Sequence, residues 1–398
     1  SKYCKKIFVT DDNPRNEDPK KIRKSIQNAC KKLSVNIANR KKAISTAIKQ
    51  LEPHQILLIA GKGHEETQDY GNKVINFSDK KIVKEILKKR KYFFKKSNYK
   101  NFLMQKAFNN NLLENINYNG VSINSKEIKK NNIFFAIKGK NTDGHNFAKE
   151  AYNKGATKLV VSKKIKKIPS NKIIKVKNTF SSLNNLAKIT RDHSFSKIIG
   201  ITGSAGKTTL KNLISFSLEN YGKVYHSPRS YNNKFGVPLS ICNLKNNTDY
   251  GVFEIGMDKK GEIDNLSRIV KPEIGIITNI AGAHFKNFKK LKDIAKAKAE
   301  IINNIPKGGN IILNKDGGFF NFLSNRAKNN KIKVTSFSLK KKSDIFLIQI
   351  KKIKKLYRLK INVKNKIFYF YIKNKTSNFI NNFLACITVI SALNLNLN

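Results

Sequence analysis

The chain has 398 residues, a formal net charge of +54 and four cysteines. This length is enough for two or three domains. The basic residues are nearly all lysine and are spread from end to end, and Asn and Ile are also abundant, so codons rich in A and T explain the charge more simply than a nucleic-acid-binding face. The cysteines form no CxxC pair, which argues against a disulfide framework or a zinc site. The absence of a signal-like start and of an apolar run near 18 residues leads us to expect a soluble, cytoplasmic protein.

Residues 1–92 are expected to form a small α/β unit, too short for a complete doubly wound domain. Apolar runs predict strands at 6–10 and 55–60, and helices are expected at 18–33 and 78–89. The stretch 88–99 is rich in lysine and aromatic residues without clear periodicity. We therefore place a linker at 93–105.

Two further α/β regions are predicted after the linker. In 106–195 we expect strands at 133–137 and 158–161 and a helix at 147–155. In 196–398, strands at 197–200, 251–255, 274–278 and 310–313 alternate with helical segments, which is typical of a parallel sheet. Residues 333–373 alternate like antiparallel strands, and 378–393 read as an apolar helix. The expected fold class is therefore α/β and multidomain.

The most informative motif is a glycine-rich turn between the strand at 197–200 and a helix expected from 207 to 221. Such a turn presents backbone N–H groups and a helix N-terminus to a phosphate, and this one satisfies TGxxGK[ST] although Ile201 departs from GxxxxGK[ST]. An ordinary Gly/Thr turn is the alternative. The phosphate-binding candidates are Thr202, Gly203, Ser204, Ala205, Gly206, Lys207, Thr208 and Thr209.

Four polar residues follow this turn at the ends of later elements. Glu254 ends one strand, Asn279 and His284 follow the next, and Lys298 lies on the helix after that. Taken singly, each has another explanation: a helix cap for Glu254, a surface hydrogen bond for His284 and a solvated amine for Lys298.

Together these motifs resemble the Mur ligases of peptidoglycan precursor synthesis. The resemblance runs from about residue 105 to the end and is closest to the members that add D-Ala-D-Ala to UDP-MurNAc-tripeptide. Besides the glycine-rich turn, it rests on Tyr231-Asn-Asn-Lys-Phe-Gly-Val-Pro238, Glu254-Ile-Gly256, the stretch 279–284, Ala295-Lys-Ala-Lys298 and Leu313-Asn-Lys-Asp316.

This resemblance implies a parallel-sheet P-loop ATPase domain at 196–398 that forms an amide by way of an acyl phosphate. It implies ATP and Mg²⁺ as cofactors, UDP-MurNAc-peptide and D-Ala-D-Ala as small-molecule partners, and a monomer that neither binds nucleic acid nor inserts into a membrane. Lys207, His284 and Lys298 match the catalytic positions, Thr208 and Glu254 the first Mg²⁺ site, and His284 and a carbamylated Lys298 a second.

Other matching positions concern nucleotide and substrate. The resemblance assigns Asn279, Asn378 and Asn381 to the nucleotide, Asn232 and Asn233 to a substrate-side turn, and Ser125 with the stretch 138–145 to a uridine-nucleotide-binding module at 106–195. Lys126, Ser230 and Ser377 depart from the residues usual in the family at their positions.

The first segment resembles the C-terminal domain of the members that add meso-diaminopimelate. The matching stretches are Thr10-Asp-Asp-Asn13-Pro-Arg15 and Ala60-Gly61-Lys-Gly-His-Glu65. A guanidinium at Arg15 and a carboxylate at Glu65 suit a zwitterionic amino acid. A turn and a surface acid are the alternative for either stretch alone.

The chain thus resembles the end of one ligase joined to the beginning of the next. Whether it is a natural fusion or a truncated fragment stays open, and without a closing C-terminal domain we expect it not to complete ligation. A non-catalytic nucleotide-binding fragment, a folylpolyglutamate-synthase-like ligase and a basic nucleic-acid-binding ATPase remain alternatives. The second would lack the uridine module, and the third would need a clustered Arg/Lys face.

Overall fold

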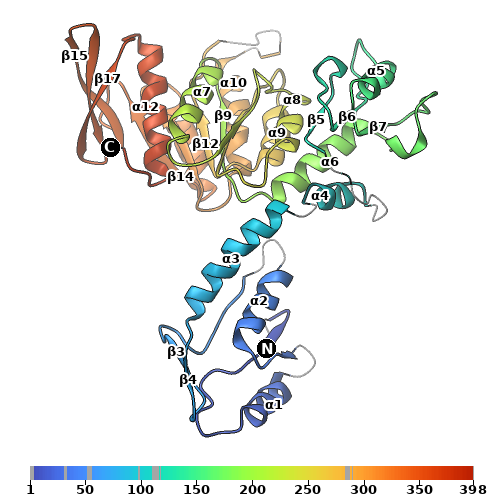
Figure 1. Cartoon of the computed structure of the whole chain (residues 1–398). Helices are drawn as coiled ribbons and strands as arrows, with labels where there is room; N and C mark the ends of the chain where they lie inside the picture. Colours follow the sequence, from blue (N-terminus) through green and yellow to red (C-terminus); the bar gives the residue numbers. More distant parts are fainter. Residues whose placement is uncertain are drawn as a thin grey trace. The chain divides into compact units, whose positions relative to one another are not determined.

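The computed structural model describes residues 4–30, 34–51, 56–96, 99–109, 116, 118–282, 287, 288 and 290–397. The chain divides into two compact units, Ser1–Ser97 and Asn98–Asn398, and each is described by itself (Figure 1). The boundary between the units falls within the stretch in which we placed a linker.

The first unit combines short strands with three helices. Strands β1 (Ile7–Val9) and β2 (Ser34–Asn36) pair in parallel, and β3 (Thr67–Asp69) and β4 (Val74–Asn76) form an antiparallel hairpin. The helices are α1 (Pro19–Cys30), α2 (Arg40–Gln50) and α3 (Asp79–Lys96). Asn39 begins α2 by accepting a hydrogen bond from the Lys42 amide, and the helix buries Ala43, Ile44, Ala47 and Ile48.

One expectation for this unit was wrong. The predicted strand at 55–60 is irregular over its described residues 56–60, where Ile56 and Leu58 are 93% and 84% exposed. An apolar run becomes a strand only when a neighbouring strand takes up its hydrogen bonds. The stretch at 93–105, in which we placed a linker, includes the end of α3, which continues to Lys96, and most of α4 (Tyr99–Phe108) in the second unit.

The second unit begins with α4 and a four-stranded parallel sheet. The sheet order is β5 (Gly120–Ser122), β6 (Asn132–Phe135), β7 (Lys158–Val161) and β8 (Ile173–Lys175). Strand β6 reads Asn-Ile-Phe-Phe and is buried on both faces, as expected for a central parallel strand. Helix α5 (Ala148–Asn153) packs against β7, while α6 (Thr179–Asp192) packs against β6 and leads to the next sheet.

A nine-stranded sheet forms the rest of the second unit. Its order is β10-β11-β9-β12-β13-β14, all parallel, followed by β15 (Ile345–Ile353), which pairs in parallel with β14, and then by β16 (Leu356–Val363) and β17 (Lys366–Ile372). The parallel strands are β10 (Val224–His226), β11 (Tyr250–Glu254), β9 (Lys197–Thr202), β12 (Ile274–Ile277), β13 (Asn310–Asn314) and β14 (Lys333–Ser338). The predicted parallel sheet is confirmed, although β14 belongs to its parallel part rather than to the antiparallel region expected from 333.

Helices cover both faces of this sheet. On one face α7 (Lys207–Leu218) and α12 (Ser377–Ala392) pack with Ile199, Ile201 and Val252. On the other, α8 (Gly236–Cys242), α9 (Glu262–Val270) and α11 (Phe320–Asn329) pack with Ile198 and Phe253. Helix α10 (Leu291–Lys298) continues into a 3₁₀ turn, Ala299–Asn304, on this second face. The carboxyl ends of β9, β11 and β12 therefore lie at one edge, where parallel sheets bind ligands.

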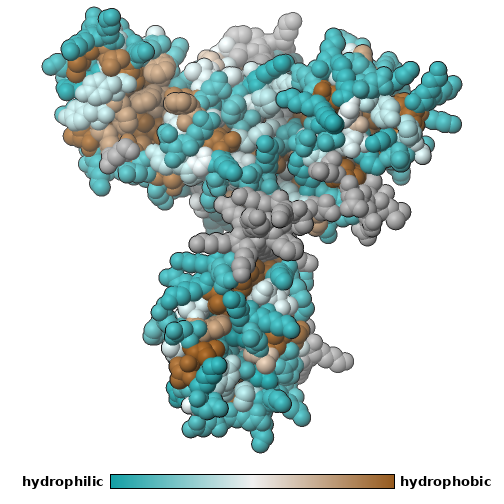
Figure 2. All heavy atoms as spheres, in the orientation of Figure 1, coloured by the Kyte–Doolittle hydropathy of each residue, from teal (hydrophilic) through white to brown (hydrophobic). Residues whose placement is uncertain are grey.

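The sheet ends in an antiparallel extension. Strands β15 (Ile345–Ile353), β16 (Leu356–Val363) and β17 (Lys366–Ile372) pair in sequence, and β17 is the outermost strand. Ile367, Tyr369 and Tyr371 alternate along β17 and are each more than half exposed. Figure 2 shows apolar side chains in the region where Figure 1 places β15, β17 and α12, on an otherwise largely hydrophilic face. Within the part of the chain that the structure describes, no helix has both the length and the apolar character needed to cross a bilayer.

Candidate functional site

The glycine-rich turn forms a tight loop between β9 and α7. Gly203 and Gly206 have positive φ angles of 151° and 80°, and Gly206 directly precedes the first residue of the helix. A Cβ atom on Gly203 would collide with the hydroxyl of Thr278. Both glycines are therefore required for the shape of the loop. The loop leads directly into the N-terminus of α7, whose first N–H groups have no acceptor within the helix, and this arrangement is one that binds phosphate.

Residues beyond β12 hold the loop from the other side. Asn279 Oδ1 accepts a hydrogen bond from the Ala205 amide at 2.9 Å, and Thr278 Oγ1 donates to the Ala205 carbonyl at 2.7 Å. The Ser204 amide donates to the Asn279 carbonyl at 3.0 Å. Asn279 thus shapes the loop, and its predicted contact with a nucleotide stays a prediction. Thr202 Oγ1 is buried at the base of the loop without a hydrogen-bond partner among the described residues.

Glu254 lies beside the loop at the end of β11, as the sequence indicated. Its side chain is buried, Oε2 accepts from Thr208 Oγ1 at 2.8 Å, and Oε1 accepts from Asn232 Nδ2 at 2.8 Å. The structure therefore brings the two predicted metal-binding residues, Thr208 and Glu254, together. A buried carboxylate and a hydroxyl in contact provide oxygen ligands of the kind Mg²⁺ prefers.

Two lysines face this region with weakened affinity for protons. Burial lowers the pKa of Lys207, and the nearby Glu254 carboxylate offsets part of that effect. The Lys207 ammonium donates to the Gly203 carbonyl at 2.9 Å. Lys298 is only 2% exposed, and burial together with the positive charge of Lys207 lowers its pKa to about 7. Lys298 is therefore not the solvated surface amine that its sequence context would suggest.

Not every predicted residue can be placed. His284 lies outside the described residues. Among those that are described, no three His, Cys, Asp or Glu side chains form a metal cluster. The Thr208–Glu254 pair is consistent with this, because Mg²⁺ commonly takes one or two carboxylates and completes its shell with phosphate and water.

The asparagines of α12 divide between two environments. Asn378 is exposed, whereas Asn381 Oδ1 accepts from Asn314 Nδ2 at 3.3 Å. Asn382, which the sequence reading missed, lies 3.2 Å from where a Cβ of Gly206 would stand. On the substrate side, Asn233 accepts from the amides of residues 235 and 236 and so fixes the start of α8.

The sequence reading also missed Lys211, one turn after the loop on α7. Its side chain is buried, and its ammonium donates to the carbonyls of Ser227 and Arg229 at 2.8 and 2.5 Å. Burial lowers its pKa, against the attraction of Glu254. In a chain so rich in lysine, the sequence around Lys211 does not mark this residue as functional. Only its position four residues after Lys207 could have indicated it.

Ser125 lies at a pocket of about 310 Å³ beside the four-stranded sheet. Its hydroxyl donates to Glu150 at 2.8 Å. The lining residues are Ile123, Asn124, Ser125, Lys126, Phe134, Ile137, Gly139, Thr142, Gly144, Phe147 and Phe235.

His145 does not line this pocket. Its imidazole contacts Asp143 at 2.6 Å and Ser162, and hydrogen bonds from Lys163 and His145 hold the pKa of Asp143 well below its usual range.

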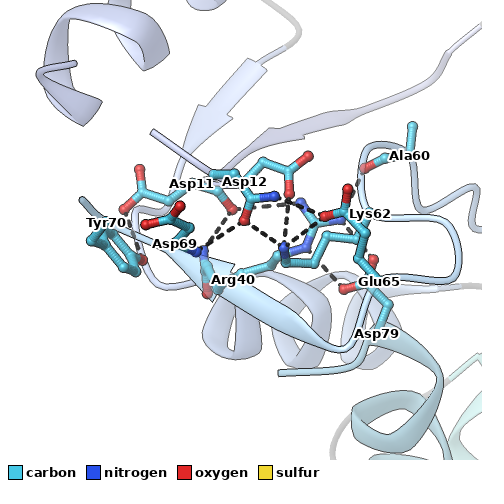
Figure 3. A network of polar contacts seen from close by, with 11 residues as sticks. Asp11, Asp12, Arg40, Ala60, Lys62, Glu65, Asp69, Tyr70 and Asp79 are labelled. Atoms are coloured by element: carbon cyan, nitrogen blue, oxygen red, sulfur yellow. Dashed lines mark hydrogen bonds and ion pairs between the residues drawn. The ribbon is translucent and has the colours of Figure 1, made fainter. Parts of the chain in front are cut away.

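In the first unit, a polar network surrounds the predicted amino-acid site (Figure 3). The buried Lys62 donates to Asn13 Oδ1 at 2.7 Å, and Asn13 Nδ2 donates to Glu65 at 2.8 Å. The hydrogen bond from Asn13, followed by that from Lys62, lowers the pKa of Glu65. Gly61 adopts φ 114°, where a Cβ would collide with the Asp12 carboxylate. The structure thus groups Asn13, Gly61 and Glu65.

Arg15 stands apart from this network. It is exposed, has a φ of 50°, and its amide donates to the Asp69 carbonyl at 3.1 Å. Arg40, by contrast, is buried, and its guanidinium binds Asp79 at 2.9 and 2.7 Å and the Ala60 carbonyl at 2.9 Å. Arg40 therefore anchors the irregular segment that precedes Gly61.

Three family models match the chain. They are the Mur ligase middle domain over residues 201–390, the Mur ligase family catalytic domain over 117–191, and the Mur ligase glutamate ligase domain over 1–63. The match at 117–191 covers the module that the folylpolyglutamate-synthase alternative would lack.

Curated relatives and solved structures point the same way. The chain is 36% identical over 279 residues to a UDP-N-acetylmuramoyl-tripeptide–D-alanyl-D-alanine ligase of Rickettsia prowazekii, covering 70% of this chain and 62% of that one. It is 34% identical to the ligase of the same name from Buchnera aphidicola, covering 71% and 61%. The chain thus spans about three fifths of the length of these relatives.

Among solved structures, a crystal structure of MurF from Acinetobacter baumannii superposes with a TM-score of 0.65 at 25% identity, covering 74% of this chain and 65% of that one. The MurF ligase from Thermotoga maritima in complex with ADP superposes with a TM-score of 0.63 at 25% identity, covering 72% and 65%. With its phosphate loop, its sheet order and these matches along both units, the chain belongs to the Mur ligase family and is MurF-like in its second unit.

Proposed function

We propose that the second unit is the ATP- and UDP-substrate-binding part of a ligase that adds D-Ala-D-Ala to UDP-MurNAc-tripeptide. The observation that carries the proposal is the loop from Thr202 to Thr209 with Thr208 hydrogen-bonded to the buried Glu254. The pocket at Ser125 lies in the same unit and offers an apolar and polar lining for a uridine nucleotide.

The reaction would be an ATP-dependent amide synthesis. The tripeptide carboxylate attacks the γ-phosphorus of ATP and releases ADP, which yields an acyl phosphate. The amine of D-Ala-D-Ala then attacks the acyl carbon, and phosphate leaves with the electrons of the broken C–O bond. The chain's own contribution is positioning, because the loop amides and Lys207 would hold the phosphates.

Mg²⁺ would be held by Thr208 and Glu254, and when bound it would neutralise phosphate charge. A carbamate on Lys298 would add a second carboxylate-like group. Supporting this, Lys298 has a pKa of about 7 and so is partly neutral at neutral pH, and only a neutral amine reacts with CO₂. His284 and the asparagines Asn378 and Asn381 keep the metal and nucleotide roles that the family resemblance implies for them.

The test is calorimetric titration of the chain with ATP and Mg²⁺. Replacing Lys207 by Ala removes the cation nearest the loop, and we expect ATP affinity to fall by at least about a hundredfold. Lys223→Ala removes the same charge from an exposed position and is the matched control. Unchanged ATP affinity in the Lys207 variant would refute the proposal.

We further propose that the first unit binds the amino acid meso-diaminopimelate. Asn13, Gly61 and Glu65 would contact the amino end and Arg15 a carboxylate, since each offers the opposite charge or a hydrogen bond. NMR titration should show amide shifts at these residues with meso-diaminopimelate, and weaker ones with L-lysine, which lacks the second carboxylate. Equal shifts with both amino acids would contradict this assignment.

We also propose that the protein acts as a monomer in the cytoplasm, where ATP and nucleotide-linked precursors are available. Light scattering during gel filtration would test the monomer directly.

A further inference from the structure

Lys211 forms a clamp between the phosphate-loop helix and the segment 227–233. The side chain is 1% exposed, and both of its hydrogen bonds go to carbonyls of that segment, Ser227 at 2.8 Å and Arg229 at 2.5 Å. A buried ammonium is costly unless it is paired. The chain therefore commits a charged group to fixing the path of this one segment, which we call the clamped loop.

One side of the clamped loop reaches the residues proposed to hold Mg²⁺. Asn232 Nδ2 donates to Glu254 Oε1 at 2.8 Å, and the Glu254 amide donates to Ser227 Oγ at 3.3 Å. The Gly256 amide donates to the Asn232 carbonyl at 2.7 Å. The position of the Glu254 carboxylate thus depends on where the clamped loop lies.

The other side of the clamped loop reaches the pocket at Ser125. Arg229 Nη1 and the Tyr231 hydroxyl each donate to the Glu127 carboxylate at 3.2 Å. Glu127 follows Ser125 and Lys126 in the 3₁₀ turn that lines the pocket. These exposed contacts are individually weak, so they can hold only if the loop is already in place.

The loop also contains a strained residue. Arg229 has φ 48°, in the left-handed region that a side-chain-bearing residue adopts only when its surroundings enforce it. The Arg229 carbonyl is one of the two that Lys211 binds, so the clamp acts directly on the strained position.

We propose that Lys211 is a positioning residue that holds the clamped loop in place. The clamped loop in turn fixes the position of the Glu254 carboxylate on one side and of Glu127, at the uridine pocket, on the other. The inference rests on the proposed function of these two sites. Lys211 touches neither ligand. Its effect passes through the backbone of residues 227–233.

Hydrogen exchange of the full chain tests the clamp without any ligand. Lys211→Met keeps an unbranched side chain that is one heavy atom shorter and removes the donors, and we expect the amides of 227–233 to exchange at least about tenfold faster. Lys223→Met is the charge-matched control and should leave them unchanged, as should amides of β9 in both variants. Unchanged exchange at 227–233 in the Met variant, or equally faster exchange in β9, would overturn the proposal.

Binding supplies the second measurement. We expect Lys211→Met to weaken UDP-MurNAc-tripeptide binding about tenfold, with ATP binding in EDTA changed less than about twofold, and Lys211→Arg to recover part of the loss. A double variant with Glu127→Gln should be no weaker than the worse single variant, because both act through one loop; additive losses would contradict this. If the unaltered chain fails to bind the uridine substrate, the proposed function fails, and hydrogen exchange still decides the role of Lys211.

Discussion

Lys298 shows how strongly burial changes the chemistry of a single residue. Its amine is enclosed near Lys207, and its pKa is lowered to about 7. An ordinary surface lysine is almost entirely protonated at that pH. Because of this lower pKa, Lys298 can react with CO₂ near neutral pH. The lower pKa also sets the direction in which carbamate formation changes with pH.

We predict that Lys298 forms a carbamate more readily above pH 7 than below it. With a pKa of about 7, roughly a tenth of the amine is neutral at pH 6 and roughly nine tenths at pH 8. Carbon NMR of the protein in ¹³C-labelled bicarbonate should show a carbamate signal that grows over this range and is absent from Lys298→Met. The exposed Lys296→Met variant is the control and should retain the signal. A signal that survives in Lys298→Met would place the carbamate elsewhere.

The sequence could identify residues that belong to a pattern, and it could not identify those that work by position alone. Thr208 and Glu254 lie 46 positions apart, yet both were predictable, because one completes a loop motif and the other ends a strand. Lys211 and Asn382 were missed, since their importance comes from which backbone atoms lie opposite them once the helices pack.

At the scale of elements, the strand–loop–helix unit from β9 to α7 depends on the absence of a side chain at Gly203. We predict that Gly203→Ala destabilises the second unit by about 2–4 kcal/mol and abolishes ATP binding, because the new Cβ meets Thr278 and the φ of 151° disfavours any L residue. Thermal unfolding and calorimetry would measure both effects.

Gly318→Ala is the comparison for that substitution. A Cβ added at Gly318 would meet no other atom within 4 Å, and the φ angle of Gly318 is not in the left-handed region. We expect its stability and its ATP affinity to match those of the unaltered chain. Similar losses in both variants would mean that the loop geometry is not the cause.

Element prediction succeeded where apolar residues are central and failed where pairing is marginal. The runs at β9, β11, β12 and β13 became strands within the expected limits of a residue or two. The equally apolar run at 55–60 is irregular where it is described, and β2 has only three residues, Ser-Val-Asn. In the first unit the anchoring contacts are polar, such as Arg40 with Asp79, and hydropathy patterns do not reveal them.

At the scale of the whole molecule, the chain carries a large positive charge. The size of this charge does not tell a ligase from a nucleic-acid-dependent ATPase, but the distribution of the charged residues does. The lysines are spread over the sequence rather than clustered, and the sequence contains only nine arginines. We predict that ATP turnover, if present, is not stimulated by single-stranded DNA, and that binding to DNA is independent of sequence and falls steeply with salt. Filter binding at a series of salt concentrations, beside an ATPase assay, would check this. Stimulation by DNA at about 150 mM salt would instead favour the nucleic-acid-dependent reading.

The outermost strand of the large sheet has a practical consequence for handling the protein. Among the described residues no strand pairs with the outer edge of β17, beside Ile367, Tyr369 and Tyr371, and such edges can pair with a second molecule in concentrated solution. Lys366 begins the strand and Lys373 follows it, and repulsion between these lysines of two molecules opposes that pairing at low ionic strength. Added salt would screen the repulsion, so aggregation that rises with salt and is suppressed by Tyr369→Lys would trace self-association to this edge.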